Sequence, residues 1–323
     1  MADNYLINDL VNAKIDGLRA GFGKGLVAAG KKNDKILALC ADLTESTKMD
    51  LFANEFPERF VQVGVAEQNL AALASGFASM GYIPFTSSYA AFHPGRSWEQ
   101  IKTTICMNEQ NVKIIGSHAG ISVGPDGATH QMFEDIAIMR TMPGMTIICP
   151  GDAIEAEKAT LAMAGDSRPN YLRLARASTP VFTTEKTPFK IGRAYRYRSG
   201  KDISLIGTGT MTYHVLLAAE KLSKDGIEAD VIHVPTIKPL DAATIVGSAE
   251  KTGAVVTAEE GQVKGGLGGA VAELLAEEQP TLMGRIGIND HYGQSGDPTD
   301  LMKAFKLTAD DIYKKALVIL KNK

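Results

Sequence analysis

The sequence predicts an α/β protein made of two doubly wound, three-layer domains. Short apolar runs of strand length alternate along the chain with amphipathic stretches of helical length. Such connections are right-handed crossovers, which give mostly parallel sheets covered by helices on both faces. Residues 177–200 interrupt the alternation with two prolines, several threonines and a mixed-charge stretch. At about 150 residues per domain, the 323 residues fit two domains, which we expect at 1–185 and 190–323.

In the first domain, apolar runs at 35–41 and 60–66 read as buried strands. The second run leads directly into EQNLAALASGFASMG, an alanine-rich helix that should end at Gly81. The alternation then continues to Arg176 through YIPFTS, WEQIKTTICMN, VKIIGSH, a long glycine-rich loop, FEDIAIMRTM, MTIICP, AIEAEKATLAMAG and NYLRLAR.

In the second domain, the predicted strands are ISLIGTG, ADVIHV, AVVTAEE and TLMGRIGI. The helix that follows the first of them has Val215, Ala219 and Leu222 on one face, at the spacing of an amphipathic helix. A terminal helix has the apolar residues Ile312, Ala316, Ile319 and Leu320. This half of the chain is therefore expected to repeat the strand–helix architecture of the first.

Composition excludes several classes of protein. The 34 basic and 37 acidic residues give a net charge of −3, which disfavours nucleic acid or an anionic membrane as the main partner. No apolar run approaches the ~18 residues of a membrane helix, and MADNYLINDL lacks a signal-peptide pattern. Cys40, Cys106 and Cys149 are too far apart in sequence to indicate a disulfide framework or a CxxC metal site. Cys40 and Cys149 lie in apolar runs, so we expect them to be buried. The lack of a disulfide pattern and of a signal peptide leads us to expect a cytoplasmic protein.

Glu67 stands between a predicted strand and a predicted helix. Ligands of open α/β sheets bind at the carboxyl ends of the strands, so this position suits a functional acid. A helix-start acid stabilised by the helix dipole is the alternative, and position alone favours it.

The glycine-rich segment 116–131 contains His118, Asp126 and His130 after an apolar strand. Loops of this length inside a domain are usually functional or disordered. The segment is either a polar binding surface for a small hydroxylated ligand or a surface loop with incidental histidines. Its spacings match no compact metal-ligand pattern.

Other candidates are weaker. The glycine clusters at 207–210 and 261–269 do not read GxGxxG between a strand and a helix, so tight turns are the better interpretation. Tyr89, Phe92 and Trp98 suit a core as well as a stacking site. Four arginines could bind a phosphate: Arg19, Arg96, Arg173 and Arg176.

Four long segments occur in order along the chain: ADLTESTK, FPERFVQVGVAEQNLAALASGFASMGYIPFTSSYAAF, SHAGISVGPDGATHQMFEDIAIMRTMPGMTIICPGD and YLRLARAS. Together they resemble transketolase, a thiamine-diphosphate enzyme. The resemblance covers nearly the whole chain. It implies a thiamine-diphosphate pyrimidine-binding domain over 1–185 followed by a transketolase C-terminal domain over 190–323.

The family binds the cofactor's diphosphate and Mg²⁺ through a preceding domain with a GDG…N motif, and this chain contains no GDG. The resemblance therefore implies the C-terminal half of a split transketolase. Its partner would be an N-terminal subunit that carries the diphosphate-binding domain and most of the metal site. A dimer of heterodimers is expected, because the cofactor lies between domains of different units.

The resemblance also assigns roles to individual residues. Glu67 in VAEQN matches the catalytic glutamate that hydrogen-bonds the cofactor's aminopyrimidine and favours its imino tautomer. Tyr89 and Phe92 match aromatic residues that stack on this ring, with Gly95 where the family often has a third. Asp42 matches an acid near the cofactor. The remaining matches are to residues that bind the substrate. His118 and His130 match histidines that contact sugar hydroxyls and the developing alkoxide, and Asp126 matches an aspartate that recognises the configuration of a hydroxyl group. The matches to the phosphate-binding residues are Arg19, Ser46 and Arg176.

The implied activity is transfer of a two-carbon ketol group from a ketose phosphate to an aldose phosphate. The chain is expected to be active only together with its partner subunit. Three alternatives remain: the beta subunit of a 2-oxo-acid dehydrogenase, a deoxyxylulose-phosphate-synthase-like enzyme, and a non-catalytic relative. GVAEQN and DGATHQ favour transketolase. The sequence does not distinguish the pentose phosphate route from other sugar catabolism.

Overall fold

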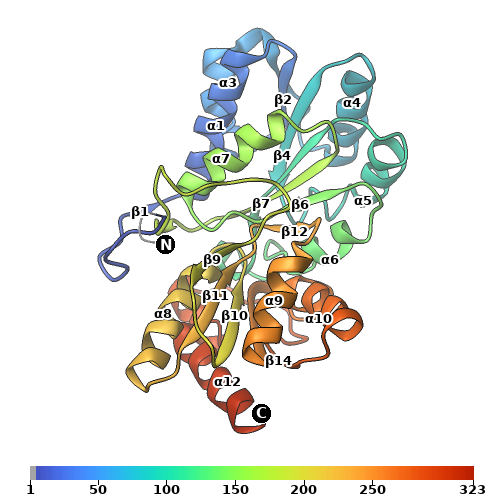
Figure 1. Ribbon diagram of the computed structural model, residues 1–323. Coiled ribbons are helices and arrows are strands. Elements are labelled where there is room, and N and C mark those ends of the chain that lie inside the picture. Colours follow the sequence, from blue (N-terminus) through green and yellow to red (C-terminus); the bar gives the residue numbers. More distant parts are fainter. Residues whose placement is uncertain (1–4) are drawn as a thin grey trace.

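The computed structural model describes residues 5–323, which fold into two α/β lobes (Figure 1). The first lobe follows the predicted alternation. Its strands are β1 Ile15–Asp16, β2 Ile36–Cys40, β3 Phe60–Gln62, β4 Ile83–Tyr89, β5 Lys113–Ala119, β6 Thr146–Ile148, β7 Asn170–Ala175 and β8 Thr179–Pro180. Its helical segments are α1 Leu18–Lys32, α2 Thr44–Thr47, α3 Asp50–Glu55, η1 Pro57–Arg59, α4 Glu67–Ser79, α5 Trp98–Gln100, the π-helical η2 Ile101–Cys106, η3 Ile121–Asp126, α6 Asp135–Arg140 and α7 Ala153–Ala164.

The second lobe repeats the strand–helix pattern, as expected. The strands in this half of the chain are β9 Tyr195–Arg198, β10 Ile203–Gly207, β11 Ala229–His233, β12 Thr236–Lys238, β13 Ala254–Gln262 and β14 Leu282–Ile288. Of these, β12 belongs to the sheet of the first lobe. Its helices are α8 Met211–Lys224, α9 Ala242–Thr252, α10 Leu267–Glu278, α11 Pro298–Ala304 and α12 Ala309–Lys321. The last of these begins with a capping box between Thr308 and Asp311.

The strands form two mostly parallel sheets. The larger has the order β12-β6-β7-β5-β4-β2-β3, and the smaller has the order β14-β13-β10-β11-β9. Only β12 with β6 and β9 with β11 pair in antiparallel fashion within these sheets. The short strands β1 and β8 form a separate antiparallel pair. This topology confirms the predicted fold class.

Helices cover both faces of each sheet. Alternate residues of a strand point to opposite faces, and in β2 Ile36 packs in one apolar cluster with α1 and α7, whereas Leu37 packs in another with α4. In the second sheet, Leu205 packs with α8 and α12, while its neighbour Ile206 packs with α9 and α10. The three-layer arrangement thus follows from the two-residue period of buried strands.

The two lobes share structure. One apolar cluster contains Leu70 and Ile147 from the first lobe together with Ile232 and Val255 from the second. In addition, β12 lies in the second half of the chain but pairs with β6 at the edge of the larger sheet. The sequence did not predict this strand, because its three residues form no apolar run.

A buried polar network also connects the lobes. Arg173 in β7 donates to the carboxylate of Asp135 at 2.9 Å and to the main-chain oxygen of Glu260, in β13, at 2.6 Å. Tyr171 donates its hydroxyl to the same Asp135 oxygen at 2.7 Å. Because the guanidinium is 7% exposed and the carboxylate fully buried, each charge depends on the other for compensation.

The cysteines Cys40, Cys106 and Cys149 are all buried and unpaired, which confirms the expectation for the first and last. Burial raises the pKa of the Cys106 thiol to about 11 and that of Cys149 to about 12. Within residues 5–323, no helix has both the length and the apolar character needed to cross a membrane.

Arg173→Met should lower the free energy of unfolding by about 3–5 kcal/mol, because it leaves the Asp135 carboxylate buried without its cation. Arg168→Met is the matched control. Its ion pair with Asp166 lies at the surface, with the arginine 47% exposed, so the loss should not exceed about 1 kcal/mol. Urea unfolding of both variants measures the difference, and equal losses would contradict the structural role of the buried pair.

Candidate active site

Two predicted site residues lie at the carboxyl ends of adjacent strands. Tyr89 is the last residue of β4, and it is paired in register with Ser117 of β5, next to His118. This edge of a parallel sheet is where ligands of open α/β folds bind. The alternation of strands and helices therefore places both residues at this edge of the sheet.

A local irregularity orients His118. The register between β5 and β7 shifts between Gly116 and Ala119, and His118 has a left-handed backbone with a φ of 55°. Bulges of this kind redirect a side chain. As a result the imidazole is buried and stacks on the Tyr89 ring, with centroids 3.7 Å apart and an interplanar angle of 21°.

His118 is neutral, and its tautomer can be assigned. Burial, followed by the charges of Arg19, Arg176 and His130, lowers the pKa of His118 to about 3. Arg19 Nη1 lies 3.5 Å from Nε2, and Ser117 Oγ lies 2.8 Å from Nδ1. Because a guanidinium only donates, Nε2 is the acceptor and Nδ1 carries the proton.

The predicted phosphate-binding residues meet beside this histidine. Arg19 in α1 donates to the main-chain oxygen of Ser46 and, at 2.8 Å, to that of Arg176. Its Nε atom is buried and has no hydrogen-bond partner among the described residues. Burial and the nearby Arg176 charge lower the pKa of Arg19. The arrangement presents an unsatisfied cationic donor to any ligand that reaches it.

The aromatic residues are adjacent, as their expected role requires. Tyr89 and Phe92 are nearly parallel, with centroids 6.2 Å apart and an angle of 13°. His130 from the glycine-rich segment meets Phe92 edge-on at 5.3 Å. Planar rings in this arrangement can hold a flat heteroaromatic ligand.

Glu67 is the first residue of α4, and its side chain is 2% exposed. Arg96 donates from Nη1 to Glu67 Oε2 at 2.6 Å, and Ser88 Oγ donates to Oε1 at 3.4 Å. The Arg96 guanidinium also lies over the Phe92 ring, 4.8 Å from its centroid. Contacts therefore run without a break from Glu67 through Arg96 and Phe92 to the histidines, and on to Arg19.

Two predicted residues stand apart from these contacts. Asp42 and Asp126 are both exposed, and neither carboxylate makes a hydrogen bond or ion pair within residues 5–323. Asp42 has a left-handed backbone with a φ of 64°, and its amide donates to Gln62. Asp126 ends η3, at the surface of the glycine-rich segment.

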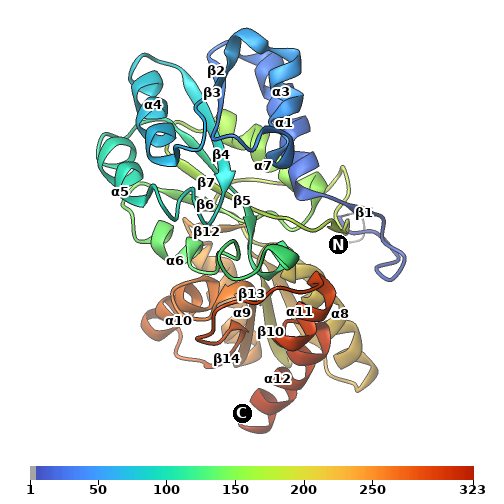
Figure 2. The ribbon, with the colours of Figure 1, turned by 180° about the vertical axis from the view of Figure 1, so that it is seen from behind.

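The second lobe fixes the start of the glycine-rich segment. Glu260 of β13 accepts a hydrogen bond from the Ser122 amide at 2.7 Å. A Cβ atom at Gly120, where φ is 85°, would lie 2.4 Å from that same carboxylate, so the close approach requires glycine. Farther along, α11 packs against η3 (Figure 2).

The structure separates the four candidate phosphate-binding arginines into two groups. Arg19 and Arg176 lie together, whereas Arg96 and Arg173 bind the carboxylates of Glu67 and Asp135. The pairing of Arg96 with Glu67 could not be expected from the sequence because the two residues are far apart in the chain. The contact of Ser117 with His118 Nδ1 was not predicted either, and the sequence indicates it only in that Ser117 directly precedes His118.

Both glycine clusters contain tight turns, as predicted, and the second also includes the end of β13 and the start of α10. Gly209 and Gly265 have φ values of 56° and 81°. After the second turn, the Glu259 carboxylate accepts hydrogen bonds from Leu267 and Gly268 at the start of α10, each at 2.8 Å. A protein carboxylate thus occupies the place that a phosphate takes in dinucleotide-binding folds. Burial raises the pKa of Glu259 to about 7.

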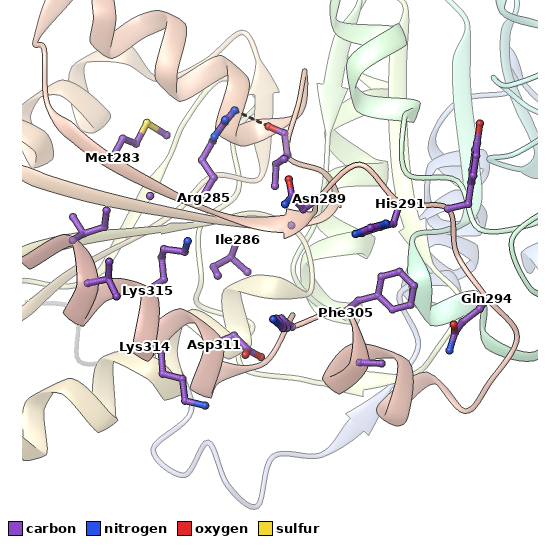
Figure 3. A pocket seen from close by; sticks show the side chains of 18 residues that line it. Met283, Arg285, Ile286, Asn289, His291, Gln294, Phe305, Asp311, Lys314 and Lys315 are labelled. Atoms are coloured by element: carbon purple, nitrogen blue, oxygen red, sulfur yellow. Dashed lines mark hydrogen bonds between the residues drawn. The ribbon is translucent and has the colours of Figure 1, made fainter.

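A large open cleft lies elsewhere, on the second lobe. It has a volume of about 1060 Å³ and is formed by β14, α12 and the segment between β14 and α11 (Figure 3). Its side chains include Arg285, Lys314, Lys315 and Phe305, but no predicted site residue lines it. Within the described part of the chain, no group of three or more His, Cys, Asp or Glu residues is placed to hold a metal ion.

Comparison with protein families identifies both halves of the chain. Residues 17–181 match the transketolase pyrimidine-binding domain, and residues 192–312 match the transketolase C-terminal domain. These two matches cover the two lobes in the order that the sequence predicted.

Several relatives of similar length are described as transketolase sections or subunits. A putative transketolase C-terminal section from Methanocaldococcus jannaschii is 42% identical over 94% of this chain and 96% of its own length. A 6-deoxy-6-sulfo-D-fructose transketolase subunit from a Clostridium species is 40% identical, over 92% of each chain. One of the subunits of an apulose-4-phosphate transketolase from Phocaeicola vulgatus is 35% identical, over 94% of this chain and 97% of its own.

Solved structures of transketolases resemble this chain as well. A split-gene transketolase, described as an inactive beta4 tetramer, is 42% identical with a TM-score of 0.89, over 94% of this chain and 98% of that chain. The transketolase of Campylobacter jejuni, at 23% identity and a TM-score of 0.81, shares the fold over 95% of this chain and 47% of its own. The chain therefore belongs to the transketolase family, as a C-terminal section that carries the pyrimidine-binding and C-terminal domains.

Proposed function

We propose that this chain is the C-terminal subunit of a thiamine-diphosphate-dependent transketolase. It would transfer a two-carbon ketol group from a ketose phosphate to an aldose phosphate, using domains at 1–185 and 190–323. The observation that supports this most directly is the unbroken row of contacts from the buried Glu67 to the guanidinium of Arg19, whose Nε has no hydrogen-bond partner among the described residues. One end suits a heteroaromatic ring, and the other suits a phosphate.

The residues at the Glu67 end fit the cofactor's aminopyrimidine. The buried Glu67 carboxylate offers an anionic acceptor, and Arg96 links it to Phe92, which is nearly parallel to Tyr89. Each oxygen of Glu67 has one protein donor, which leaves further lone pairs for a ring nitrogen. When bound, thiamine diphosphate supplies the chemistry that breaks and forms the carbon–carbon bond. Glu67 would hold a proton at the ring nitrogen and so favour the imino tautomer.

The residues at the other end fit a sugar phosphate. Arg19 and Arg176 present two positive charges, and guanidinium groups bind phosphate through paired hydrogen bonds. Neutral His118 has one acceptor nitrogen, Nε2, and its contact with Arg19 is long, at 3.5 Å, so a sugar hydroxyl would replace Arg19 as the donor. His130 reaches the same region from the glycine-rich segment. In this proposal Ser46 completes the phosphate site, and Asp126 reads a hydroxyl group at its exposed edge.

The exposed face of α4 supports a partner subunit. Its residues carry no charge and are Gln68, Asn69, Ala72, Leu73, Gly76 and Ser79, followed by Met80, which is 72% exposed. Depletion of charged residues is typical of the core of a protein–protein interface. We propose that it packs against an N-terminal subunit that supplies the diphosphate site and most of the Mg²⁺ ligands. The missing GDG motif and the inactive tetramer of the split-gene relative support this division.

The proposed substrates are a ketose phosphate donor and an aldose phosphate acceptor. The relatives named above act on different substrates, a sulfosugar in one case and apulose 4-phosphate in another. A cytoplasmic dimer of heterodimers, in the pentose phosphate route or in other sugar catabolism, is the proposed setting. Asp42 is assigned to the cofactor-proximal edge of the subunit interface.

Glu67→Gln should lower kcat of the reconstituted two-subunit enzyme by about 10²–10⁴-fold, because the amide cannot take over the carboxylate's role in proton transfer. Partner binding and the circular dichroism spectrum should not change. Turnover within a fewfold of the wild type would contradict the assignment of Glu67.

Arg176→Gln should raise KM for a phosphorylated aldose by about 10- to 100-fold, because a charge-assisted contact to the phosphate is lost. KM for the corresponding unphosphorylated aldose should change little. Arg193→Gln, which removes an exposed arginine 3.9 Å from Asp241, is the control and should alter neither value. Equal effects on both aldoses would place the phosphate elsewhere.

Leu73→Asp should abolish binding of the N-terminal subunit, because it buries a charge in the proposed interface. Leu282→Asp is a matched control, since the two leucines are 38% and 40% exposed but Leu282 lies on the second lobe. Size-exclusion chromatography with light scattering measures assembly. If the first variant assembles as well as the second, α4 is not the interface.

A further inference from the structure

We propose that Arg96 is a positioning residue of the active site. Its guanidinium orients the Glu67 carboxylate and, lying over Phe92, forms a third planar surface of the aminopyrimidine pocket. This inference rests on the proposed function, because it assigns the aminopyrimidine to Glu67 and Phe92.

The Glu67 carboxylate is oriented mainly by one donor. Arg96 is the charged donor, at 2.6 Å, whereas the contact from Ser88 is longer, at 3.4 Å. A buried carboxylate without a strong donor can rotate about its terminal bond, because that torsion is broad. Arg96 therefore determines which lone pairs of Glu67 remain available to a ring nitrogen.

The Arg96 guanidinium also stands beside the place of the missing aromatic residue. Gly95 stands where the family often has a third ring, and a Cβ atom there would lie 2.1 Å from the main-chain oxygen of Ala91. The turn thus cannot accept an aromatic side chain at this position without a change of backbone. The next residue, Arg96, instead places a planar cation 4.8 Å from the Phe92 centroid, where guanidinium groups pack favourably.

The turn that carries Arg96 is rigid. His93 is fully buried and bonds Thr86 at 2.8 Å through Nε2 and Ser97 at 2.7 Å through Nδ1. Burial lowers the pKa of His93 to about 3, so this bridge is neutral and constant over the working range of pH. The Arg96 amide also donates to the Phe92 main-chain oxygen at 3.0 Å. The base of Arg96 is therefore fixed, although its side chain is 49% exposed.

The other ionisable side chains on the elements packed against α4 are engaged elsewhere. Tyr89 stacks on His118, Lys102 lies over Trp98, Glu99 accepts from Gln100, Cys40 contacts Thr47 and Cys106 contacts Met142. Arg96 is consequently the cation that acts on Glu67.

The test compares Arg96→Gln with Arg96→Lys in the reconstituted two-subunit enzyme. Arg96→Gln should lower kcat at saturating thiamine diphosphate by about 10- to 100-fold, because Glu67 loses its charged donor. It should also raise Kd for thiamine diphosphate, measured by calorimetry, by about threefold to tenfold. Arg96→Lys should restore most of kcat but not Kd, because an ammonium keeps the charge and lacks the planar surface.

Three outcomes would overturn the proposal. Unchanged kcat and Kd in Arg96→Gln would remove both roles. Equal kcat in the lysine and glutamine variants would remove the orienting role, and tighter cofactor binding in Arg96→Gln would mean that the guanidinium obstructs the pocket. Arg193→Gln serves again as the exposed control, since its guanidinium is 61% exposed.

A measurement on the isolated chain separates this inference from the proposed function. The nitrogen resonances of the Arg96 guanidinium should shift in Glu67→Gln and should not shift in Glu273→Gln, which removes an exposed acid paired with Arg140. A shift together with an inactive wild-type complex would refute the proposed function while the contact itself stands. No shift would refute the contact.

Discussion

The carboxyl end of β5 is held in place by groups from the other lobe, and the candidate site depends on this constraint. Glu260 accepts from the Ser122 amide, while Arg173 bonds the main chain of the same glutamate and the buried Asp135. Buried charges tolerate little displacement, because losing a partner exposes them to the full cost of desolvation. The lobes therefore cannot shift separately without moving the glycine-rich segment that brings His130 to the aromatic pair.

The row of contacts places opposite charges at its two ends and keeps its middle neutral. The buried Glu67 is paired with the half-exposed Arg96, whereas Arg19 and Arg176 have no carboxylate partner among the described residues. Between them the pKa of His118 is so low that the imidazole carries no charge. A protonated histidine there would repel both arginines, so neutrality is a condition for bringing the three groups together. The cationic end then remains free to compensate a ligand's negative charge.

The periodicity of the sequence predicted the buried strands, the helices between them and the layered fold class, but few other features. The runs at 35–41 and 112–118 became β2 and β5 because alternating apolar residues must face two helical layers. Strand β12 was missed since its three residues are held by pairing with β6 and not by their own composition. The bulge at His118 and the pairing of Arg96 with Glu67 are tertiary features, and residues 29 positions apart leave no local pattern. The resemblance identified most of the remaining site residues, but it could not supply their partners.

The position of Glu67 links catalysis to assembly in the proposed enzyme. This residue opens α4, and the exposed face of the same helix carries no charge. A helix moves as a rigid element, because each of its turns is fixed by main-chain hydrogen bonds. Packing that face against a partner therefore fixes the location of its first residue as well. In the proposed enzyme, the carboxylate that handles the proton would therefore lie at one end of the helix that contacts the partner subunit.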